Sequence, residues 1–463
     1  MGTPRFPSWL VPLLAILAIA PAGYFGGPEL VAGILIGAAV LIGVIVFSTQ
    51  WHSAPARPPQ PTVHPSHEPP PKLGRLIAGA IALRLVGAVI FNVTKFNRAV
   101  APDSDGYAYY GRMIATSWKN PSFSLEGVVG YNPRSFYQHL NGVIYYIADI
   151  NPSIPLSFLN AVVGTLAAWL ISRLAYSLYG AAAARRAFIL AAFYPSIVLW
   201  TSINLRDAWS FLLLAGSLLA AQALRERLTP TRVLLLLVLF AAMPFVRGYL
   251  LALVGAGVLA SYLVVRVRRL PAALATLAAL TAFLFVAANQ LGVELSVDIE
   301  DRLETMERMR NGLAYGRSAF DTSMSISTPA GAALYLPIGV ANFLFSPFPW
   351  RINSWRQIMA LPEAFLTYWL VFHAVRQMIT DVRSRLPDVA VQLFVVVSLT
   401  CAYGLVEGNE GTAFRHRAHA LLVFIIFAAA SQVRPRAPVA ATAQSKWVIS
   451  SDQLMSGKGL NGG

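Results

Sequence analysis

The stretch "LNAVVGTLAAWLISRLAYSLYGAAAARRAFILAAFYPSIVLWTSINLRDAWSFLLLAG" (159–216) decides the fold class. It consists of long apolar runs separated by two short charged segments, "ARRA" (184–187) and "NLRD" (204–207). A helix of about 20 apolar residues is long enough to cross the hydrocarbon core of a bilayer. The stretch therefore predicts consecutive membrane-spanning helices joined by short turns.

Apolar runs of this kind recur along the whole chain. Of its 463 residues, 56% are hydrophobic and 12% are charged, whereas soluble domains carry about 25% charged residues. A membrane β-barrel would show short alternating segments instead. We therefore expect an all-α polytopic membrane protein with about 11–13 transmembrane helices. The expected spans are 9–25, 29–48, 73–92, 154–179, 187–203, 207–224, two within 231–265, 272–291, 362–379, 389–406 and 418–432, with 136–150 and 330–349 ambiguous.

Polar segments divide the chain into four parts. Residues 1–50 form an N-terminal two-helix membrane segment, and residues 51–72 form a Pro-rich linker, which proline keeps from becoming helical. Residues 73–433 form the main transmembrane body, and residues 434–463 form a polar tail that we expect to be disordered. The body contains the one cysteine of the chain, Cys401, so no disulfide framework can form within it.

Positive charge dominates and is concentrated in short loops. The chain carries 36 Lys and Arg against 21 Asp and Glu, which gives a net charge of +15. In a soluble protein this excess would indicate a nucleic-acid partner. Here the arginines lie mainly between spans, as is typical of cytoplasmic loops, so we expect the lipid bilayer and no nucleic acid as a partner. The loops assigned to the cytoplasm are 185–186, 225–232, 266–269, 376–385 and 434–436.

This assignment gathers the remaining polar segments on the opposite face of the membrane. They are the loop 93–135, "INLRD" (203–207), "FVRGY" (245–249), the loop 292–328 and "EGNEGTAFRHR" (407–417). Charges at a membrane boundary away from the positive-inside face are functional by default. We therefore expect a functional surface on the non-cytoplasmic face of a plasma (inner) membrane.

The loop 292–328 contains its own helical signal. In "EDRLETMERMR" (300–310), Leu303, Met306 and Met309 share one helical stripe, and Glu304 and Arg308 stand four residues apart as an ion pair. We expect a short amphipathic helix that lies on the membrane surface.

The loop 93–135 contains two acids in "APDSDGYAYY" (101–110), Asp103 and Asp105. One interpretation is a helix N-cap, which needs only one acid. The other is a carboxylate at the membrane boundary that acts as a general base, or that holds a divalent cation. No nucleotide-binding or zinc-protease motif occurs in the chain, so no other cofactor is expected.

This loop resembles that of the GT-C superfamily of membrane glycosyltransferases, in the branch of protein O-mannosyltransferases and the lipid A aminoarabinose transferase. Asp103 stands four residues before Tyr107, as the catalytic Asp of that family does, while Ser104 departs from the family's second acidic position. Asp105 is the alternative base. "YPS" (194–196) followed by "LRD" (205–207) resembles the family's middle spans. The resemblance implies a polyprenyl-phosphate sugar donor, an acceptor on the non-cytoplasmic side, and inversion at the sugar.

A lipid-phosphate donor needs a cationic clamp, and arginine binds phosphate best because it can donate two parallel hydrogen bonds. The candidates on the outer face are Arg206, Arg247, Arg415, His416 and Arg417. Arg206 has a structural alternative as the partner of Asp207, and the others as flanking charges. Glu407 and Glu410 are candidates to support these arginines. Tyr107 would shape the substrate pocket.

Two other functions fit the same composition. A lipid-linked sugar transporter or flippase would carry charges deep within its spans and an internal repeat. A polymerase or ligase of the O-antigen type also uses arginines in outer loops, but it does not need the acids at 103 and 105.

Overall fold

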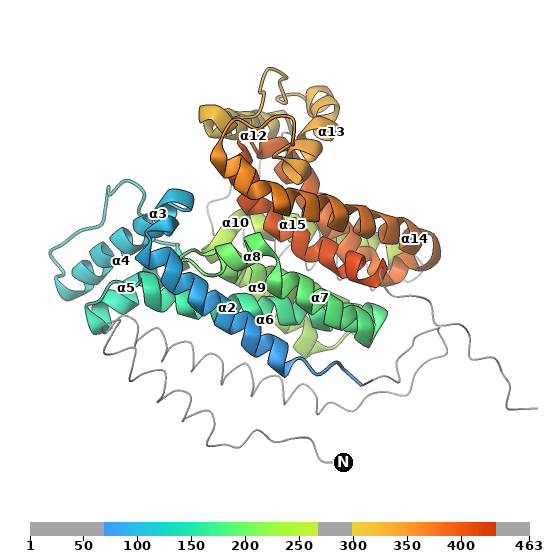
Figure 1. The fold of residues 1–463 in the computed structure, drawn as a ribbon, viewed down its shortest axis with the longest axis horizontal. Coiled ribbons are helices and arrows are strands. Elements are labelled where there is room, and N and C mark those ends of the chain that lie inside the picture. Colours follow the sequence, from blue (N-terminus) through green and yellow to red (C-terminus); the bar gives the residue numbers. More distant parts are fainter. Residues whose placement is uncertain (1–68, 267–298, 432–463) are drawn as a thin grey trace, which may run out of the picture. The chain divides into compact units, whose positions relative to one another are not determined.

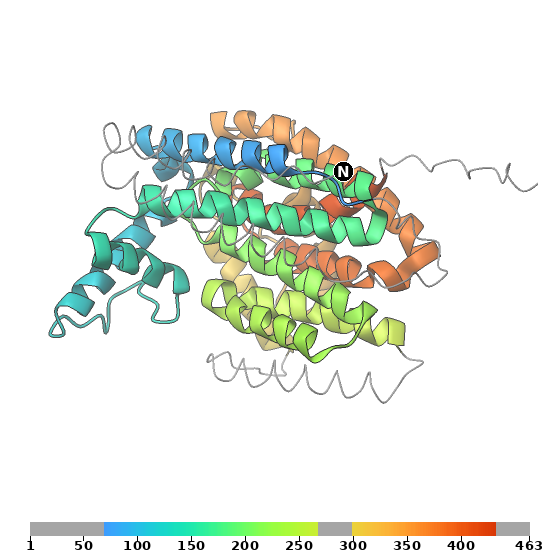
Figure 2. The same ribbon diagram turned by 90° about the horizontal axis from the view of Figure 1, so that it is seen from below.

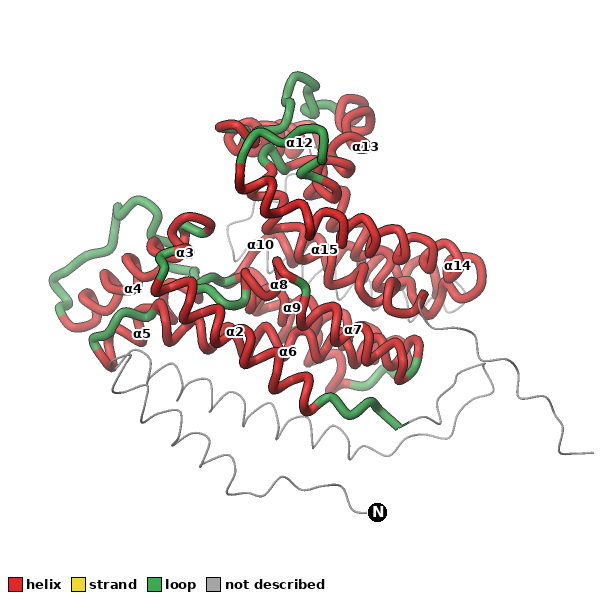
Figure 3. Tube along the Cα trace, viewed as in Figure 1, coloured by secondary structure: helices red, strands yellow, loops and turns green. Residues whose placement is uncertain are grey.

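The computed structural model describes residues 69–266 and 299–431 (Figure 1). Within these ranges the regular structure is helical, apart from one isolated bridge between Ala319 and Asn409 (Figure 3). The helices are α2 (Gly74–Val93), α3 (Phe96–Val100), α4 (Asp103–Lys119), α5 (Phe136–Ala148), α6 (Ser153–Tyr179), α7 (Ala181–Phe193), α8 (Pro195–Trp200), α9 (Asp207–Glu226), α10 (Pro230–Arg266), α12 (Ile299–Leu313), the 3₁₀ turn η2 (Gly316–Ser318), α13 (Pro329–Phe345), α14 (Trp355–Val406) and α15 (Glu410–Ser431).

Several expected segments lie outside the described residues. They are the spans 9–25, 29–48 and 272–291, the N-terminal segment 1–50 with most of the linker 51–72, and the tail 434–463.

Six of the described helices, α2, α6, α9, α10, α14 and α15, are long and apolar enough to cross a membrane. Large apolar side chains are exposed on α2, α10 and α14, and on α2 these are Leu83, Val86, Ile90 and Val93. Such a face is unfavourable in water but suits lipid, and a helix satisfies its own backbone hydrogen bonds there. The chain is an all-α polytopic integral membrane protein, as predicted.

Two of these helices are interrupted. The backbone of α10 is non-helical at Arg247 (φ −150°, ψ 98°), and that of α14 at Arg385 (φ −152°, ψ 34°). Prolines lie nearby, Pro244 in α10 and Pro387 in α14, and proline removes a backbone donor from a helix. The predicted divisions, within 231–265 and between 362–379 and 389–406, are confirmed.

The expected continuous span 187–203 is wrong. The helix ends before Tyr194, whose backbone is extended (φ −66°, ψ 126°), and the short α8 starts at Pro195. A proline disfavours the helical conformation of the residue before it, so the "YPS" segment divides the run into α7 and α8. The turn after α8 then leads directly into α9.

Arg84 of α2 stabilises this break from within the bundle. Its guanidinium is fully buried and donates to the backbone oxygen of Ala192 at 2.7 Å and to Thr201 Oγ1 at 2.8 Å. The carbonyl groups next to a helix break lack intrahelical donors and cannot be left unpaired away from water. The arginine therefore supplies the missing donors.

The long helices pack closely where glycine lies between them. In Figures 1 and 2, α6, α7 and α9 run side by side, as do α14 and α15. A Cβ atom on Gly257 of α10 would lie 2.6 Å from the Cα of Val395 in α14, and one on Gly339 of α13 would lie 2.1 Å from the oxygen of Gly404 in α14. Only glycine permits these approaches, which is typical of helix packing in membranes.

The amphipathic helix expected at 300–310 is α12, but its side chains are arranged differently. Leu303 and Met306 pack beside Ile326 and Tyr335, while Met309 is exposed. Within this helix no ion pair joins Glu304 to Arg308, which donates to Thr305 Oγ1 at 3.1 Å. Its expected place on the membrane surface stays a prediction.

Two arginines in the loops that the sequence assigns to the cytoplasm donate to backbone oxygens of neighbouring segments. The guanidinium of Arg385 donates to the backbone oxygen of Leu178 at 2.9 Å, and that of Arg225 donates to the oxygen of Pro387. The ends of α6 and α9 therefore meet the break in α14.

Candidate functional site

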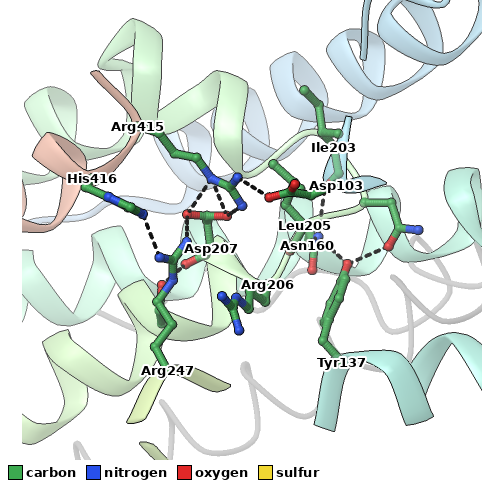
Figure 4. A network of polar contacts seen from close by, with 12 residues as sticks. Asp103, Tyr137, Asn160, Ile203, Leu205, Arg206, Asp207, Arg247, Arg415 and His416 are labelled. Carbon is green, nitrogen blue, oxygen red and sulfur yellow. Dashed lines mark hydrogen bonds and ion pairs between the residues drawn. The ribbon is translucent and has the colours of Figure 1, made fainter. Parts of the chain in front are cut away.

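A buried carboxylate, Asp207, lies at the centre of the site in Figure 4. It is the first residue of α9, and its side chain is 0% exposed. Arg415 of α15 donates to its Oδ2 atom from Nη2 at 2.6 Å and from Nε at 3.1 Å. Arg247 donates to its Oδ1 atom from Nη2 at 2.6 Å. One buried carboxylate therefore holds two guanidinium groups.

Arg415 also reaches a second carboxylate. Its Nη1 atom lies 2.7 Å from Oδ2 of Asp103, the first residue of α4, whose side chain is 56% exposed. Arg415 thus connects the buried Asp207 to an acid that is open to the surroundings.

Arg247 connects the cluster to His416. Its Nη1 atom lies 2.9 Å from Nε2 of His416, whose Nδ1 atom lies 2.5 Å from Oε1 of Glu407. A guanidinium can only donate hydrogen bonds, so Nε2 is the acceptor and the proton of the neutral ring is on Nδ1. Nδ1–H then donates to Glu407, which also accepts from Thr412.

The turn before Asp207 is held in place by Asn160 of α6. The Nδ2 atom of Asn160 donates to the oxygens of Ile203 and Leu205, both at 2.8 Å, and to the hydroxyl of Tyr137 at 2.8 Å (Figure 4). Burial raises the pKa of Tyr137 well above its ordinary value, so the phenol stays neutral. This fully buried network fixes where α9 begins.

The segments predicted to converge do so. Hydrogen bonds and ion pairs join Asp103 of the first loop, Asp207 of "INLRD", Arg247 of "FVRGY" and Arg415 of "EGNEGTAFRHR". The described part of the loop 292–328 reaches the last of these segments, because Phe320 N donates to the oxygen of Gly408 at 2.8 Å.

Two further predicted residues lie beside this cluster. Tyr107 is buried and packs edge to face on Tyr137, with ring centroids 5.0 Å apart. Burial raises its pKa. Arg206 donates from Nη1 to the oxygen of Val246 at 3.1 Å, and no dashed line joins it to Asp207 in Figure 4. The alternative that Arg206 pairs with Asp207 is therefore wrong.

Two predicted site residues are not part of the cluster. Asp105 forms an exposed ion pair with Arg98, at 3.0 Å. Arg417 is buried and donates to the oxygens of Phe343, at 2.8 Å, and Ser346. The structure therefore does not bring Asp105 or Arg417 to the cluster around Asp207.

The N-cap interpretation of the two acids is also wrong. The N-cap position of α4 is Pro102, and no side chain caps this helix end. Asp103 and Asp105 instead occupy the first turn, where the helix dipole favours negative charge.

The sequence predicted Asp207 only as a possible partner of Arg206, and it did not predict that Asp207 lies at the centre of the site. Its place in "LRD", at the end of an apolar run, was the available signal. Of the two glutamates predicted to support the arginines, Glu407 does so through His416. Glu410 instead accepts a hydrogen bond from Gln357 at 2.5 Å. Across residues 69–266 and 299–431, no group of three or more His, Cys, Asp and Glu side chains is placed to hold a metal ion.

Comparisons with protein families, with curated proteins and with solved structures find no match.

Proposed function

We propose that this protein is a GT-C-like glycosyltransferase that moves a sugar from a polyprenyl-phosphate donor to an acceptor on the non-cytoplasmic side of the plasma (inner) membrane. The observation that carries the proposal is the contact between Asp103 and the buried cluster. An exposed carboxylate held at 2.7 Å by an arginine has the access and the fixed position that a general base needs.

In this mechanism Asp103 takes the proton of the acceptor hydroxyl. The acceptor oxygen forms a bond to the anomeric carbon from the face opposite the phosphate, the bond from that carbon to the phosphate oxygen breaks, and polyprenyl phosphate leaves with the electron pair. One displacement inverts the configuration of the sugar.

Arg206 is the arginine best suited to the phosphate. Arg247 and Arg415 are already paired with the carboxylates of Asp207 and Asp103, whereas the one hydrogen bond assigned to Arg206 goes to a neutral backbone oxygen. Arg206 is half-buried and pairs with no carboxylate among the described residues, so its positive charge is available to an anion. The neutral phenol of Tyr107 lies near the same charges and would donate beside it.

The decisive experiment compares Asp103→Asn with Asp105→Asn in the purified, lipid-reconstituted protein, using a panel of polyprenyl-phosphate sugars. Loss of a general base lowers the rate by about 10²–10⁴-fold, so we expect this loss for Asp103→Asn. Asp105→Asn is the matched control, because it changes the same helix turn but not the cluster. Equal activity of the two variants would overturn the assignment.

The break in α10 supports a second candidate, a lipid-linked sugar transporter. Discontinuous helices with charged residues at the break are typical of transporter binding sites, and Arg247 lies at this one. Translocation of a lipid-linked sugar across proteoliposomes that survives Asp103→Asn, without any sugar transfer, would favour this candidate.

A further inference from the structure

We infer that Asp207 is a positioning residue, which sets the orientation and availability of the Asp103 carboxylate by acting through Arg415. For catalysis the inference rests on the proposed role of Asp103 as base. The two carboxylates have no direct contact, and the guanidinium between them contacts both.

The geometry of the guanidinium makes this coupling directional. Arg415 places Nε and Nη2 on Asp207, at 3.1 and 2.6 Å from Oδ2. The five N–H groups of arginine form a planar, rigid fork, so two bonds on one side fix the direction of the remaining donor. That donor, Nη1, points at Asp103.

Asp207 itself is held on several sides. It is fully buried at the N-terminus of α9, where the helix dipole favours a negative charge, and Arg247 donates to its other oxygen. The Asn160 network fixes the turn before it. Asp207 is therefore the fixed acid, and Arg415 sets the position of the exposed acid, Asp103, relative to it.

Charge balance gives the expected effect of removing Asp207. With Asp207 ionised, the positive charge of Arg415 is shared between two carboxylates. Without it, Arg415 would pair with Asp103 alone, and the uncompensated charge of Arg247 would add to the attraction. Asp103 would be held more tightly and would be less available to remove a proton.

The first test is kinetic and uses Asp207→Asn, which keeps the side-chain shape. We expect kcat to fall about tenfold or more while KM for the lipid donor stays within about twofold, because the chemistry and not the binding is affected. In the Asp103→Asn background the same change should cost nothing further, since residues that act as a unit are non-additive. Equal losses in both backgrounds would mean that Asp207 only supports the fold.

The second test needs no substrate. A water-soluble carbodiimide labels reactive carboxyl groups, and tandem mass spectrometry resolves Asp103 from Asp105 in one peptide, so Asp105 is the internal reference. We expect Asp207→Asn to lower the labelling of Asp103 relative to Asp105 by about threefold, because the carboxylate pairs more tightly. Arg415→Gln should raise this ratio. An unchanged ratio in both variants would overturn the inference.

A folding control is built into the design, because Asp207→Asn leaves the buried Arg247 without its carboxylate. The double variant Asp207→Asn/Arg247→Gln restores the net charge and leaves Arg415 with Asp103 alone. Both tests are repeated on it, and the same directions are expected. Shifted labelling with no sugar transfer by the wild-type protein would refute the proposed function but keep the positioning role. Sugar transfer that requires Asp103, together with unchanged labelling of Asp103, would support the proposed function but refute the positioning role.

Discussion

Arg415 and Arg417 stand two positions apart on α15, but they bind different kinds of partner. Arg415 contacts the carboxylates of Asp103 and Asp207 at the end of the bundle where the polar segments meet. Arg417 is buried and donates to the backbone oxygens of Phe343 and Ser346, where α13 ends. One arginine belongs to a charged cluster that reaches the surface, and the other replaces donors that a helix end lacks.

The second use of arginine recurs through the molecule. Buried or half-buried arginines donate to backbone oxygens near helix ends or breaks at Arg84, Arg385 and Arg417. The residues that carry these oxygens are buried away from water, so a side-chain donor is required. A buried arginine is therefore not by itself a sign of function, and it is the kind of partner that distinguishes Arg417 from Arg415.

The largest effect expected of an arginine substitution tests the first class. Arg415→Gln removes the charge that holds Asp103 and one of the two cations on Asp207. We expect the rate of sugar transfer to fall about 10²–10³-fold, the size of effect seen when a preorganised charge near the reacting atoms is lost. Initial rates with a saturating lipid donor measure this. A loss below about fivefold would place Arg415 with the structural arginines.

Arg417→Met tests the second class on the same helix. Methionine removes two donors and leaves two carbonyl oxygens unpaired, while it relieves the cost of a buried charge. We expect the free energy of unfolding to fall by about 2–4 kcal/mol, with the rate per folded molecule within about twofold of wild type. Denaturant unfolding in detergent, together with active-fraction rates, measures both. A variant that is as stable as the wild type but inactive would contradict the structural role of Arg417.

Arg84→Met extends the second class to the break between α7 and α8. The oxygens of Ala192 and Thr201 lose a charged donor, so we expect a loss of about 1.5–3 kcal/mol in unfolding free energy. The matched control is Arg75→Met on the same helix. Arg75 is exposed, and its replacement should cost within about 0.5 kcal/mol. Similar losses for the two variants would show that the carbonyl contacts do not matter.

Much of the fold could be predicted, because the bilayer restricts the choices. The runs 73–92, 154–179 and 207–224 match α2, α6 and α9 within a few residues, since an apolar segment in lipid must satisfy its backbone as a helix. The meeting of the polar segments also followed from the sequence, because the distribution of arginine assigns loops to sides of a membrane. The division of the run 187–203 into two helices was not predicted, although Pro195 disfavours a helical conformation at Tyr194.

The partners of the arginines could not be predicted, because they depend on how each helix is rotated about its axis. Residues 415 and 417 are separated by about 200° around an α-helix, so they face nearly opposite directions even though both lie close to the same polar loop. The sequence places both on the outer face and does not say which one turns toward Asp207. In the same way, Asp103 and Asp105 diverge around the first turn of α4, and Asp105 turns to Arg98.

The smallest expected effect concerns Tyr107, which lies between the two classes: it is buried like the structural arginines but close to the charged cluster. Tyr107→Phe keeps the ring on Tyr137 and removes one hydroxyl donor, so we expect KM for the lipid donor to rise about two- to fivefold, or up to about 1 kcal/mol. Burial raises the pKa of Tyr107, so the phenol stays protonated below its ordinary value near 10. The variant and the wild type should therefore have the same pH dependence of the rate between about pH 6 and 9. Tyr109→Phe, on the exposed side of α4, is the matched control. If the pH profile of Tyr107→Phe differs from that of the wild type, Tyr107 ionises during turnover instead of only donating a hydrogen bond.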